Sequence, residues 1–124
     1  MDYEGELTIL IGADCKDVRP ENALDVIAGY TVGNDLSARD WQTDPALAGS
    51  RPQWCYGKSF DKFAPVGPCI VSPQIVGDCK DCTLTTHVNG QQRQHGEIGD
   101  LVFGVRELVA FCSRGQTVSK MKGT

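Results

Sequence analysis

Residues 2–12 have the sequence Asp2-Tyr3-Glu4-Gly5-Glu6-Leu7-Thr8-Ile9-Leu10-Ile11-Gly12. The aliphatic and β-branched run after Glu6 predicts a buried strand. Side chains two positions apart on a strand lie on the same face, so Glu4 and Glu6 are expected to point into one space. Two carboxylates a few ångströms apart repel each other unless a cation or a shared proton lies between them.

A third carboxylate, Asp35, ends the next predicted strand, which covers residues 29–35. An all-oxygen site of this kind suits a hard divalent cation, namely Mg²⁺, Mn²⁺ or Ca²⁺. The alternative is that the two glutamates lie on the solvated side of an edge strand, because exposed carboxylates are common. Spacing alone therefore leaves a metal site and a solvated surface both open.

The chain has 124 residues and a formal net charge of −4. This length suits one domain with a modest core, and the charge argues against nucleic acid or an anionic membrane as a partner. No stretch approaches the roughly 20 apolar residues of a membrane span. The acidic N-terminus lacks the features of a signal peptide. We expect a cytoplasmic protein, or a mitochondrial one if a longer N-terminus exists.

The chain has six cysteines at irregular spacing, and Cys79 and Cys82 form a lone Cys-x-x-Cys motif. A structural zinc site needs a second pair or two histidines at metal spacing, and the spacing of His87 and His95 fits no standard zinc pattern. A redox motif needs a preceding strand and a helix that starts on it, whereas residues 73–81 predict a loop. We expect ordinary reduced thiols, with zinc binding and redox chemistry as the alternatives.

The first half of the chain predicts one helix and several extended segments. Apolar residues within 20–28 have the spacing of a short helix with an acidic start. Residues 43–53 are rich in turn formers and predict a mobile loop. Residues 54–60 and 64–72 are expected to be extended.

The second half predicts a hairpin followed by a helix. Asn89-Gly90 joins two extended runs, 83–88 and 91–94, and this dipeptide favours a type I′ turn. Apolar positions within 101–112 fit one helix face, and Gly115 is expected to end that helix. No internal repeat or low-complexity tract is present.

Three motifs occur in order along the chain: Asp2-Tyr3-Glu4-Gly5-Glu6-Leu7, Gly29-Tyr30-Thr31-Val32-Gly33-Asn34-Asp35-Leu36-Ser37-Ala38-Arg39-Asp40-Trp41-Gln42 and Gly57-Lys58-Ser59-Phe60-Asp61-Lys62-Phe63-Ala64-Pro65-Val66-Gly67-Pro68. Together they resemble the fumarylacetoacetate hydrolase family, and within it the small fumarylacetoacetate hydrolase domain-containing proteins. The resemblance runs from about residue 2 to residue 115. It implies one partial catalytic domain over residues 1–124, with 116–124 as a divergent tail. The implied fold is a mixed, β-rich α/β fold with a β-roll core, incomplete at both ends.

The resemblance implies that Glu4, Glu6 and Asp35 bind a divalent metal, usually Mg²⁺ or Mn²⁺. It also implies that Lys58 points at the substrate and takes part in catalysis. A bound 2-oxo acid can chelate the metal through its carboxylate and carbonyl oxygens, and the metal then acts as a Lewis acid. Lys58 would add positive charge where oxyanion character develops.

Arg39 and Gln42 are the remaining candidate substrate-binding residues. Arg39 could hold a substrate carboxylate as a bidentate partner. The alternative, which we favour, is a structural ion pair of Arg39 with Asp40 or Asp61. Gln42 could reach the site, whereas Trp41 is expected to pack.

Two family features are missing from this sequence. Family enzymes place a His-x-x-Glu dyad upstream of the first metal glutamates, as a general base for hydrolysis. They also continue after the last helix into a Leu-Thr-Gly-Thr-Pro-type loop that contacts the substrate. We therefore expect a chain that is shortened at both ends, in which neither His87 nor His95 replaces the base.

The resemblance implies an enzyme that acts on a small 2-oxo or 1,3-dicarbonyl acid. The reaction would be oxaloacetate tautomerisation or decarboxylation, or acylpyruvate-type C–C hydrolysis. A homodimer is the expected assembly. The alternative is a truncated, non-catalytic homologue that retains metal or ligand binding, or that dimerises with a full-length relative. Because the expected core is shortened, exposed edge strands and apolar surface are also expected.

Overall fold

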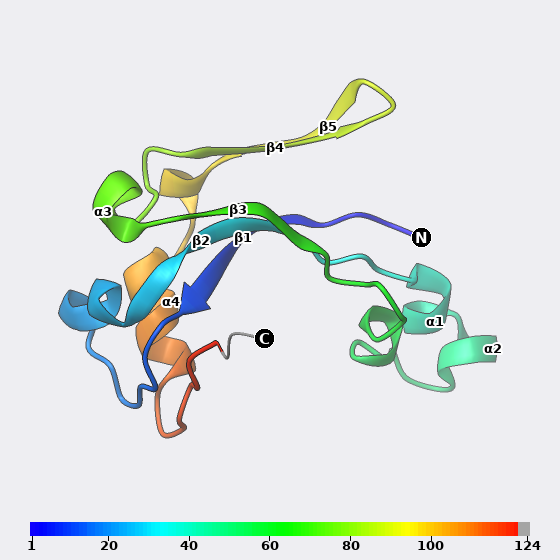
Figure 1. The fold of residues 1–124 in the computed structure, drawn as a ribbon. Coiled ribbons are helices and arrows are strands. Elements are labelled where there is room, and N and C mark those ends of the chain that lie inside the picture. Colours follow the sequence, from blue (N-terminus) through cyan, green and yellow to red (C-terminus); the bar gives the residue numbers. More distant parts are fainter. Residues whose placement is uncertain (122–124) are drawn as a thin grey trace.

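The computed structural model describes residues 1–121, so residues 122–124 of the predicted tail lie outside the described residues. Its main sheet consists of three antiparallel strands in the order β1 (Gly5–Ile11), β2 (Ile27–Asn34) and β3 (Val66–Val71). Strands β4 (Thr83–Val88) and β5 (Gln91–Glu97) form a separate hairpin beside this sheet (Figure 1). The predicted mixed, β-rich α/β fold is confirmed.

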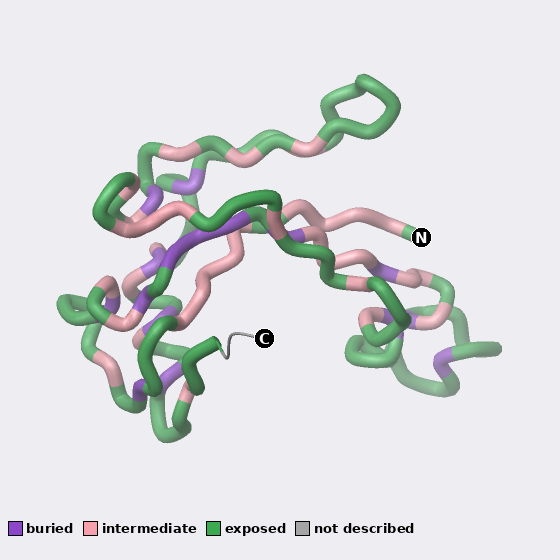
Figure 2. The backbone as a smooth tube through the Cα atoms, in the orientation of Figure 1, coloured by how far each residue is buried: buried purple, intermediate pink, exposed green. Residues whose placement is uncertain are grey.

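The register of β1 and β2 gathers apolar side chains on one face of the sheet. Leu7 lies opposite Val32, and Ile9 lies opposite Tyr30, and directly opposite residues share a face. Figure 2 shows that burial is concentrated along β2 and around α4 (Val105–Cys112). The buried cluster of the core consists of Ala23, Ile27, Tyr30, Cys79, Ile98, Val105 and Val109.

Two predicted helices exist, but each is shorter or tighter than expected. The helix predicted within 20–28 is the 3₁₀ helix η1 (Pro20–Val26). The helix predicted within 101–112 begins only at Val105, after the 3₁₀ turn η3 (Ile98–Asp100). Val102, which is 90% exposed, lies outside this helix, so it does not join the core face.

The segment predicted as a mobile loop contains regular structure. Helix α1 (Arg39–Thr43) is followed by the one-turn helix α2 (Pro45–Ala48). Asp44 caps α2 because its carboxylate accepts a hydrogen bond from the Ala46 N–H at 2.9 Å. The loop prediction for 43–53 is therefore wrong at α2.

The prediction that residues 54–60 are extended is also wrong, because the 3₁₀ helix η2 (Tyr56–Lys58) lies within them. Tyr56 packs on Trp41 with their ring centroids 5.3 Å apart, and Phe60 lies 5.9 Å from Trp41. These aromatic contacts join residues that follow no helical or strand period. Trp41 packs in this cluster, as predicted.

The Cys-x-x-Cys segment also differs from the predicted loop. The one-turn helix α3 (Pro73–Val76) lies within 73–81 and is capped by Ser72. Cys79, only 2% exposed, belongs to the core, and none of the six cysteines forms a disulfide. The expectation of ordinary thiols over zinc binding or redox chemistry stays a prediction. Burial, together with the neighbouring Cys82, raises the pKa of the Cys79 thiol to about 11. A thiol held in its protonated form is a poor nucleophile.

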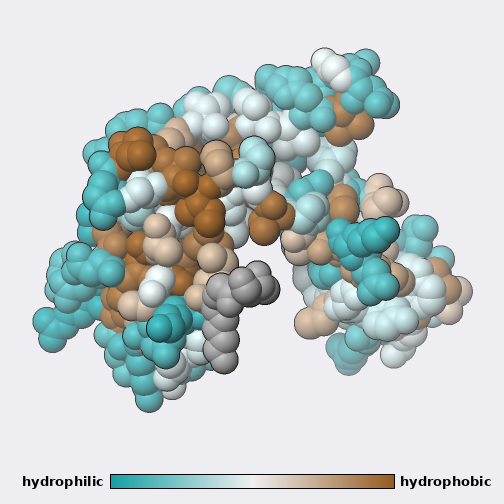
Figure 3. Space-filling view, viewed as in Figure 1, coloured by the Kyte–Doolittle hydropathy of each residue, from teal (hydrophilic) through white to brown (hydrophobic). Residues whose placement is uncertain are grey.

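Apolar surface is exposed, as expected. Within the described residues β3 pairs only with β2, and its Val66 and Ile70 are 63% and 56% exposed. Figure 3 shows hydrophobic residues gathered over the part of the molecule that carries α3 and α4. No helix within residues 1–121 has the length and apolar character needed to cross a membrane.

Val105 provides a direct test of this core. Its side chain is 2% exposed, so Val105→Ala would remove buried methyl groups and lower the free energy of unfolding by about 1–3 kcal/mol. Val102→Ala is the matched control, because Val102 is 90% exposed and its truncation should change stability by less than about 0.5 kcal/mol. Urea denaturation followed by circular dichroism measures both. Equal destabilisation by the two variants would contradict the described core.

Candidate metal centre

Glu4, Glu6 and Asp35 meet at one end of the β1–β2 pair. The ladder places Gly5 opposite Asn34, and it extends one step further because the Asp35 N–H donates to the Glu4 carbonyl at 2.8 Å. Directly opposite residues have neighbouring side chains, and Glu6 follows Glu4 on the same face. One carboxylate oxygen from each of the three residues lies within 4.8 Å of the others.

This donor set fits a hard divalent cation. Carboxylate oxygens are the ligands that Mg²⁺, Mn²⁺ and Ca²⁺ prefer in proteins. Among residues 1–121, these three form the only group of at least three histidine, cysteine, aspartate or glutamate side chains close enough to share an ion. The structure brings together the three side chains that the sequence suggested as ligands.

Lys58 lies directly against two of these carboxylates. Its Nζ donates to Glu4 Oε2 at 2.7 Å and to Asp35 Oδ2 at 2.6 Å, and the lysine side chain is only 19% exposed. Burial alone would lower the pKa of Lys58, but the hydrogen bonds to Asp35 and Glu4 outweigh it, so the pKa is raised. The ammonium group therefore keeps its charge at neutral pH and partly neutralises the carboxylates.

The backbone around Gly57 delivers Lys58 to this position. The Ala38 N–H donates to the Gly57 carbonyl at 2.8 Å, which joins η2 to the start of α1. A Cβ atom on Gly57 would lie 3.0 Å from the Gln42 Cβ and 3.2 Å from the Ala38 carbonyl oxygen. The glycine thus permits the close approach that carries Lys58 across to the sheet.

Arg39 forms a second set of ion pairs at the site. Its Nε donates to Asp2 Oδ2 at 2.9 Å, and its Nη2 pairs with Glu4 Oε1. Within the described residues Arg39 pairs with neither Asp40 nor Asp61, the partners that we expected. The strand period explains the actual pairing, because Asp2 precedes Glu4 by two positions and shares its face.

Gln42 is connected to the site through Arg39. Its Oε1 accepts a hydrogen bond from Arg39 Nη1 at 2.8 Å, and the residue is 2% exposed. Its Nε2 is buried without a hydrogen-bond partner. A buried amide donor without a partner is unfavourable in the free protein.

The pKa values of Glu4 and Glu6 are shifted in opposite directions. The Lys58 hydrogen bond, aided by Arg39, lowers the pKa of Glu4. Partial burial, followed by the charges of Asp35 and Glu4, raises the pKa of Glu6. Glu6 therefore carries the uncompensated charge of the trio, and a bound cation would relieve it.

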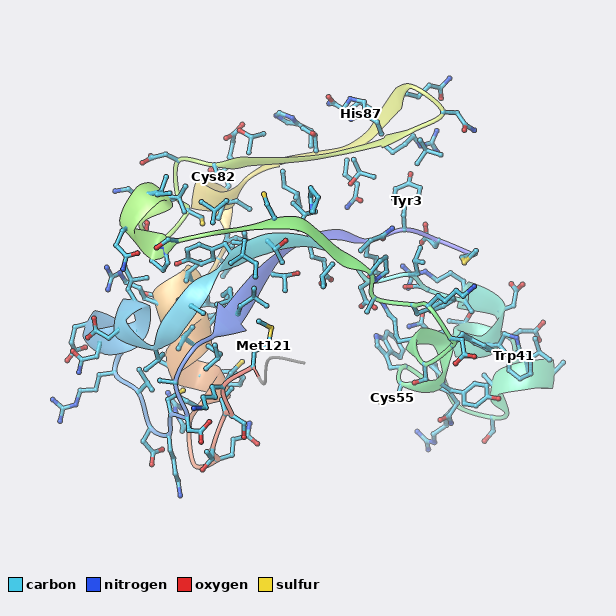
Figure 4. All side chains as sticks on the ribbon, viewed as in Figure 1. Tyr3, Trp41, Cys55, Cys82, His87 and Met121 are labelled. Carbon is cyan, nitrogen blue, oxygen red and sulfur yellow. The ribbon has the colours of Figure 1, made fainter. Side chains whose placement is uncertain are left out.

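Sequence reasoning missed two residues that shape this site. Ser37 is fully buried, and its hydroxyl donates to Glu4 Oε1 at 3.3 Å. Gln94 of β5 accepts a hydrogen bond from the Gly5 N–H at 2.8 Å, which anchors the site strand to the hairpin. The sequence gives no local signal for either contact. In Figure 4, Tyr3 points toward β5, where its hydroxyl accepts from Arg93 Nε at 2.9 Å.

The histidines lie away from the carboxylates, as expected. His87 is exposed on the hairpin (Figure 4). His95 is also exposed, and its Nε2 lies 3.5 Å from Glu97 Oε1. Neither histidine contributes to the site.

Comparison with known proteins identifies the family. The family model described as "Fumarylacetoacetate (FAA) hydrolase C-terminal" matches residues 1–121. A fumarylacetoacetate hydrolase domain-containing protein 2 homolog from Dictyostelium discoideum is 39% identical over 122 residues, which cover 92% of this chain and 39% of the relative. The mitochondrial oxaloacetate tautomerase fahd2 of Xenopus laevis is 36% identical over 119 residues, which cover 96% of this chain and 36% of the relative.

The fold agrees with the sequence comparison. The crystal structure of fumarylpyruvate hydrolase from Pseudomonas aeruginosa, in complex with Mn²⁺ and pyruvate, matches with a TM-score of 0.82 at 36% identity. The match covers 95% of this chain and 49% of that structure's chain. The chain belongs to the fumarylacetoacetate hydrolase family. It spans about two fifths of the length of the curated relatives named above. The sequence predicts that the family resemblance ends near residue 115 and that residues 116–124 form a divergent tail. This division stays a prediction.

Removal of the Lys58 charge should strengthen metal binding. The ammonium holds the oxygens of Glu4 and Asp35 that a cation would use. We expect Mn²⁺ to bind Lys58→Met roughly tenfold more tightly than the unmodified chain, because a like charge within a few ångströms costs at least about 1 kcal/mol. Titration calorimetry measures the affinity, and Lys62→Met removes an equal charge from the neighbouring exposed segment as the control. Weaker binding to Lys58→Met would contradict this interpretation.

Because the pKa of Glu6 is raised, the substitution Glu6→Gln should increase the stability of the fold, by an amount that depends on pH. A carboxyl group whose pKa is raised by folding binds an extra proton in the folded state, so its contribution to stability falls as the pH rises through that window. Without metal, Glu6→Gln should therefore raise the urea midpoint near neutral pH. The gain should vanish below about pH 4, where glutamate is largely protonated in both states. Glu21→Gln, on the exposed start of η1, is the control. A gain that is equal at both pH values would rule this explanation out.

Proposed function

We propose that this protein is a divalent-metal-dependent enzyme that acts on a small 2-oxo or 1,3-dicarbonyl acid. The observation that carries the proposal is the convergence of Glu4, Glu6 and Asp35 within 4.8 Å, with the ammonium group of Lys58 against two of them. Membership of the fumarylacetoacetate hydrolase family supports it. Two of the three related proteins named above are an oxaloacetate tautomerase and a fumarylpyruvate hydrolase, so catalysis is favoured over a non-catalytic role.

Glu4, Glu6 and Asp35 would hold the cation, because they offer one converging oxygen each. When bound, a divalent cation supplies Lewis-acid polarisation of carboxylate and carbonyl oxygens. We propose Mg²⁺ as the metal, with Mn²⁺ as the alternative because a related fumarylpyruvate hydrolase was solved with Mn²⁺. The fit rests on the all-oxygen donor set, which suits either ion and also Ca²⁺.

Lys58 is the proposed catalytic residue. Its raised pKa keeps the side chain charged at neutral pH, so it would stabilise negative charge that develops on a substrate oxygen. It is poorly suited to remove a proton, because a base must be deprotonated at the working pH.

Gln42 and Arg39 are proposed to bind the substrate. The unpartnered Nε2 of Gln42 could donate to a substrate oxygen. Arg39 is already engaged by Asp2 and Glu4, so contact with a substrate carboxylate would require it to share or release these partners. Its main role in the free protein is to hold the Glu4 carboxylate in place.

Enol–keto conversion of oxaloacetate is the first reaction to test, since it is the activity named for the Xenopus relative. Decarboxylation of oxaloacetate and acylpyruvate hydrolysis are the other reactions within the proposal. We also propose a homodimer as the assembly and the cytoplasm as the compartment. Exposed apolar residues on β3 and α4 support the assembly proposal.

An ultraviolet assay of oxaloacetate tautomerisation and decarboxylation, with Mg²⁺ and with EDTA, tests the function. We expect a Mg²⁺-dependent rate that falls roughly tenfold or more in Glu4→Ala and Asp35→Ala, because each removes a ligand from the proposed cation site. Asp25→Ala is the control, because this exposed carboxylate lies in η1, away from the trio.

Two outcomes would contradict the proposal in different ways. If no rate exceeds background while Mg²⁺ still binds, the chain is a binding protein rather than an enzyme. If Mg²⁺ binding survives both Glu4→Ala and Asp35→Ala, the assignment of the metal ligands is wrong.

A further inference from the structure

A cleft at the carboxylate site is lined by charged groups and by one aromatic ring. Its volume is about 490 Å³, and it is lined by Glu4, Asp35, Trp54, Cys55, Lys58 and Ser59. This volume lies within the range of small-molecule sites. The lining includes the charged groups of Glu4, Asp35 and Lys58, and the indole of Trp54 is its only aromatic group. A ligand with a charged head and a flat apolar tail would contact both kinds of group.

Trp54 lies outside the cluster of aromatic rings that surrounds Trp41. The neighbouring rings of Trp41, Tyr56, Phe60 and Phe63 stack with centroids between 5.3 and 5.9 Å apart. Among the described residues, Trp54 belongs to no such ring pair, and it is 64% exposed. Because this exposed indole lines the same cleft as Glu4, Asp35 and Lys58, a molecule bound there can cover it and remove its apolar surface from water.

Backbone hydrogen bonds fix the segment that carries Trp54. The Gln53 N–H donates to the Gln42 carbonyl at 2.8 Å, and the Lys58 N–H donates to the Cys55 carbonyl at 3.1 Å. Figure 4 shows Cys55 on this segment, near the end of the sheet that carries α1. The indole is thus attached between two anchored residues of the site, and little ordering of the backbone is needed when a ligand binds.

We propose that Trp54 is a specificity-determining residue that stacks on a planar, conjugated tail of a 2-oxo acid, while the acid's 2-oxo carboxylate head lies among the charged groups of the cleft. This inference rests on the proposed function, and it narrows the substrate class. A flat tail covers the π face of the indole without losing rotational freedom. A saturated tail must freeze its torsions to do the same, and a bare head group leaves the ring exposed.

Three ligands separate these cases. Pyruvate offers the head group alone, 2-oxo-4-phenylbutanoate adds a saturated tail, and (E)-2-oxo-4-phenylbut-3-enoate adds a conjugated one. Titration calorimetry with the Mn²⁺-loaded chain measures the affinity of each ligand without requiring turnover. We expect the conjugated acid to bind at least roughly tenfold more tightly than pyruvate, as is typical of ring stacking, and more tightly than its saturated analogue.

Substitutions of Trp54 then test which residue produces the preference. Trp54→Ala should abolish most of the preference for the conjugated acid while leaving the pyruvate affinity unchanged. Trp54→Phe should retain most of it, because an aromatic face remains. Phe111→Ala is the matched control, because Phe111 is an exposed aromatic residue on α4, at the other end of the sheet.

The outcomes separate this inference from the proposed function. Binding of pyruvate together with an unchanged ligand preference in Trp54→Ala would overturn the role of Trp54 and leave the proposed function intact. Equal binding of the saturated and conjugated acids would overturn the substrate class. If none of the three acids binds to the Mn²⁺-loaded chain while oxaloacetate is converted, the inference alone fails. If oxaloacetate is not converted either, both the inference and the proposed function fail.

Discussion

The site depends on the antiparallel pairing of β1 with β2. It also depends on the positive charges of Lys58 and Arg39, which offset the repulsion between the carboxylates that this pairing brings together. The register that packs Leu7 and Ile9 against the core also sets Glu4 beside Asp35. The same hydrogen-bond ladder thus produces both the core face and the cluster of acids. Such a cluster opposes folding unless it is neutralised, and Lys58 and Arg39 supply that neutralisation from outside the sheet.

The two ends of the sheet are stabilised by different forces. At one end, Tyr30 packs in the core formed with η1 and α4, and its hydroxyl donates to the Gly77 carbonyl at 2.9 Å. At the other end, α1 and η2 reach the sheet through ion pairs and hydrogen bonds to residues 2–4 and Asp35 (Figure 1). The hydrophobic effect has no directional requirement, whereas hydrogen-bonded ion pairs demand defined distances and angles. The end that requires defined geometry is the one that carries the candidate site.

Sequence reasoning succeeded where the alternation of side chains along a strand, or a turn-forming dipeptide, determines which residues are neighbours. The alternation of β1 predicted that Glu4 and Glu6 share a face, and Asn89-Gly90 predicted the hairpin, in which both residues have positive φ values of 52° and 78°. It failed between residues 43 and 60, where the chain is organised by contacts among aromatic rings that no local period reveals. The pairing of Arg39 with Asp2 was missed for a similar reason, since nearer carboxylates in the sequence seemed the simpler partners.

The carboxylates that converge at the site come from segments that are distant along the chain, and Lys58 adds a third segment. A cation held there would cross-link the beginning of β1 to the end of β2, much as a disulfide closes a loop. Because the folded arrangement alone presents the three oxygens together, cation concentration would set the stability of this end of the molecule by mass action. When the cation binds, amide hydrogen exchange around residues 35–42 would slow because this region would open less often. Exchange in α4 would stay nearly constant. The cation would thus change the local stability of the site without changing that of the core around α4.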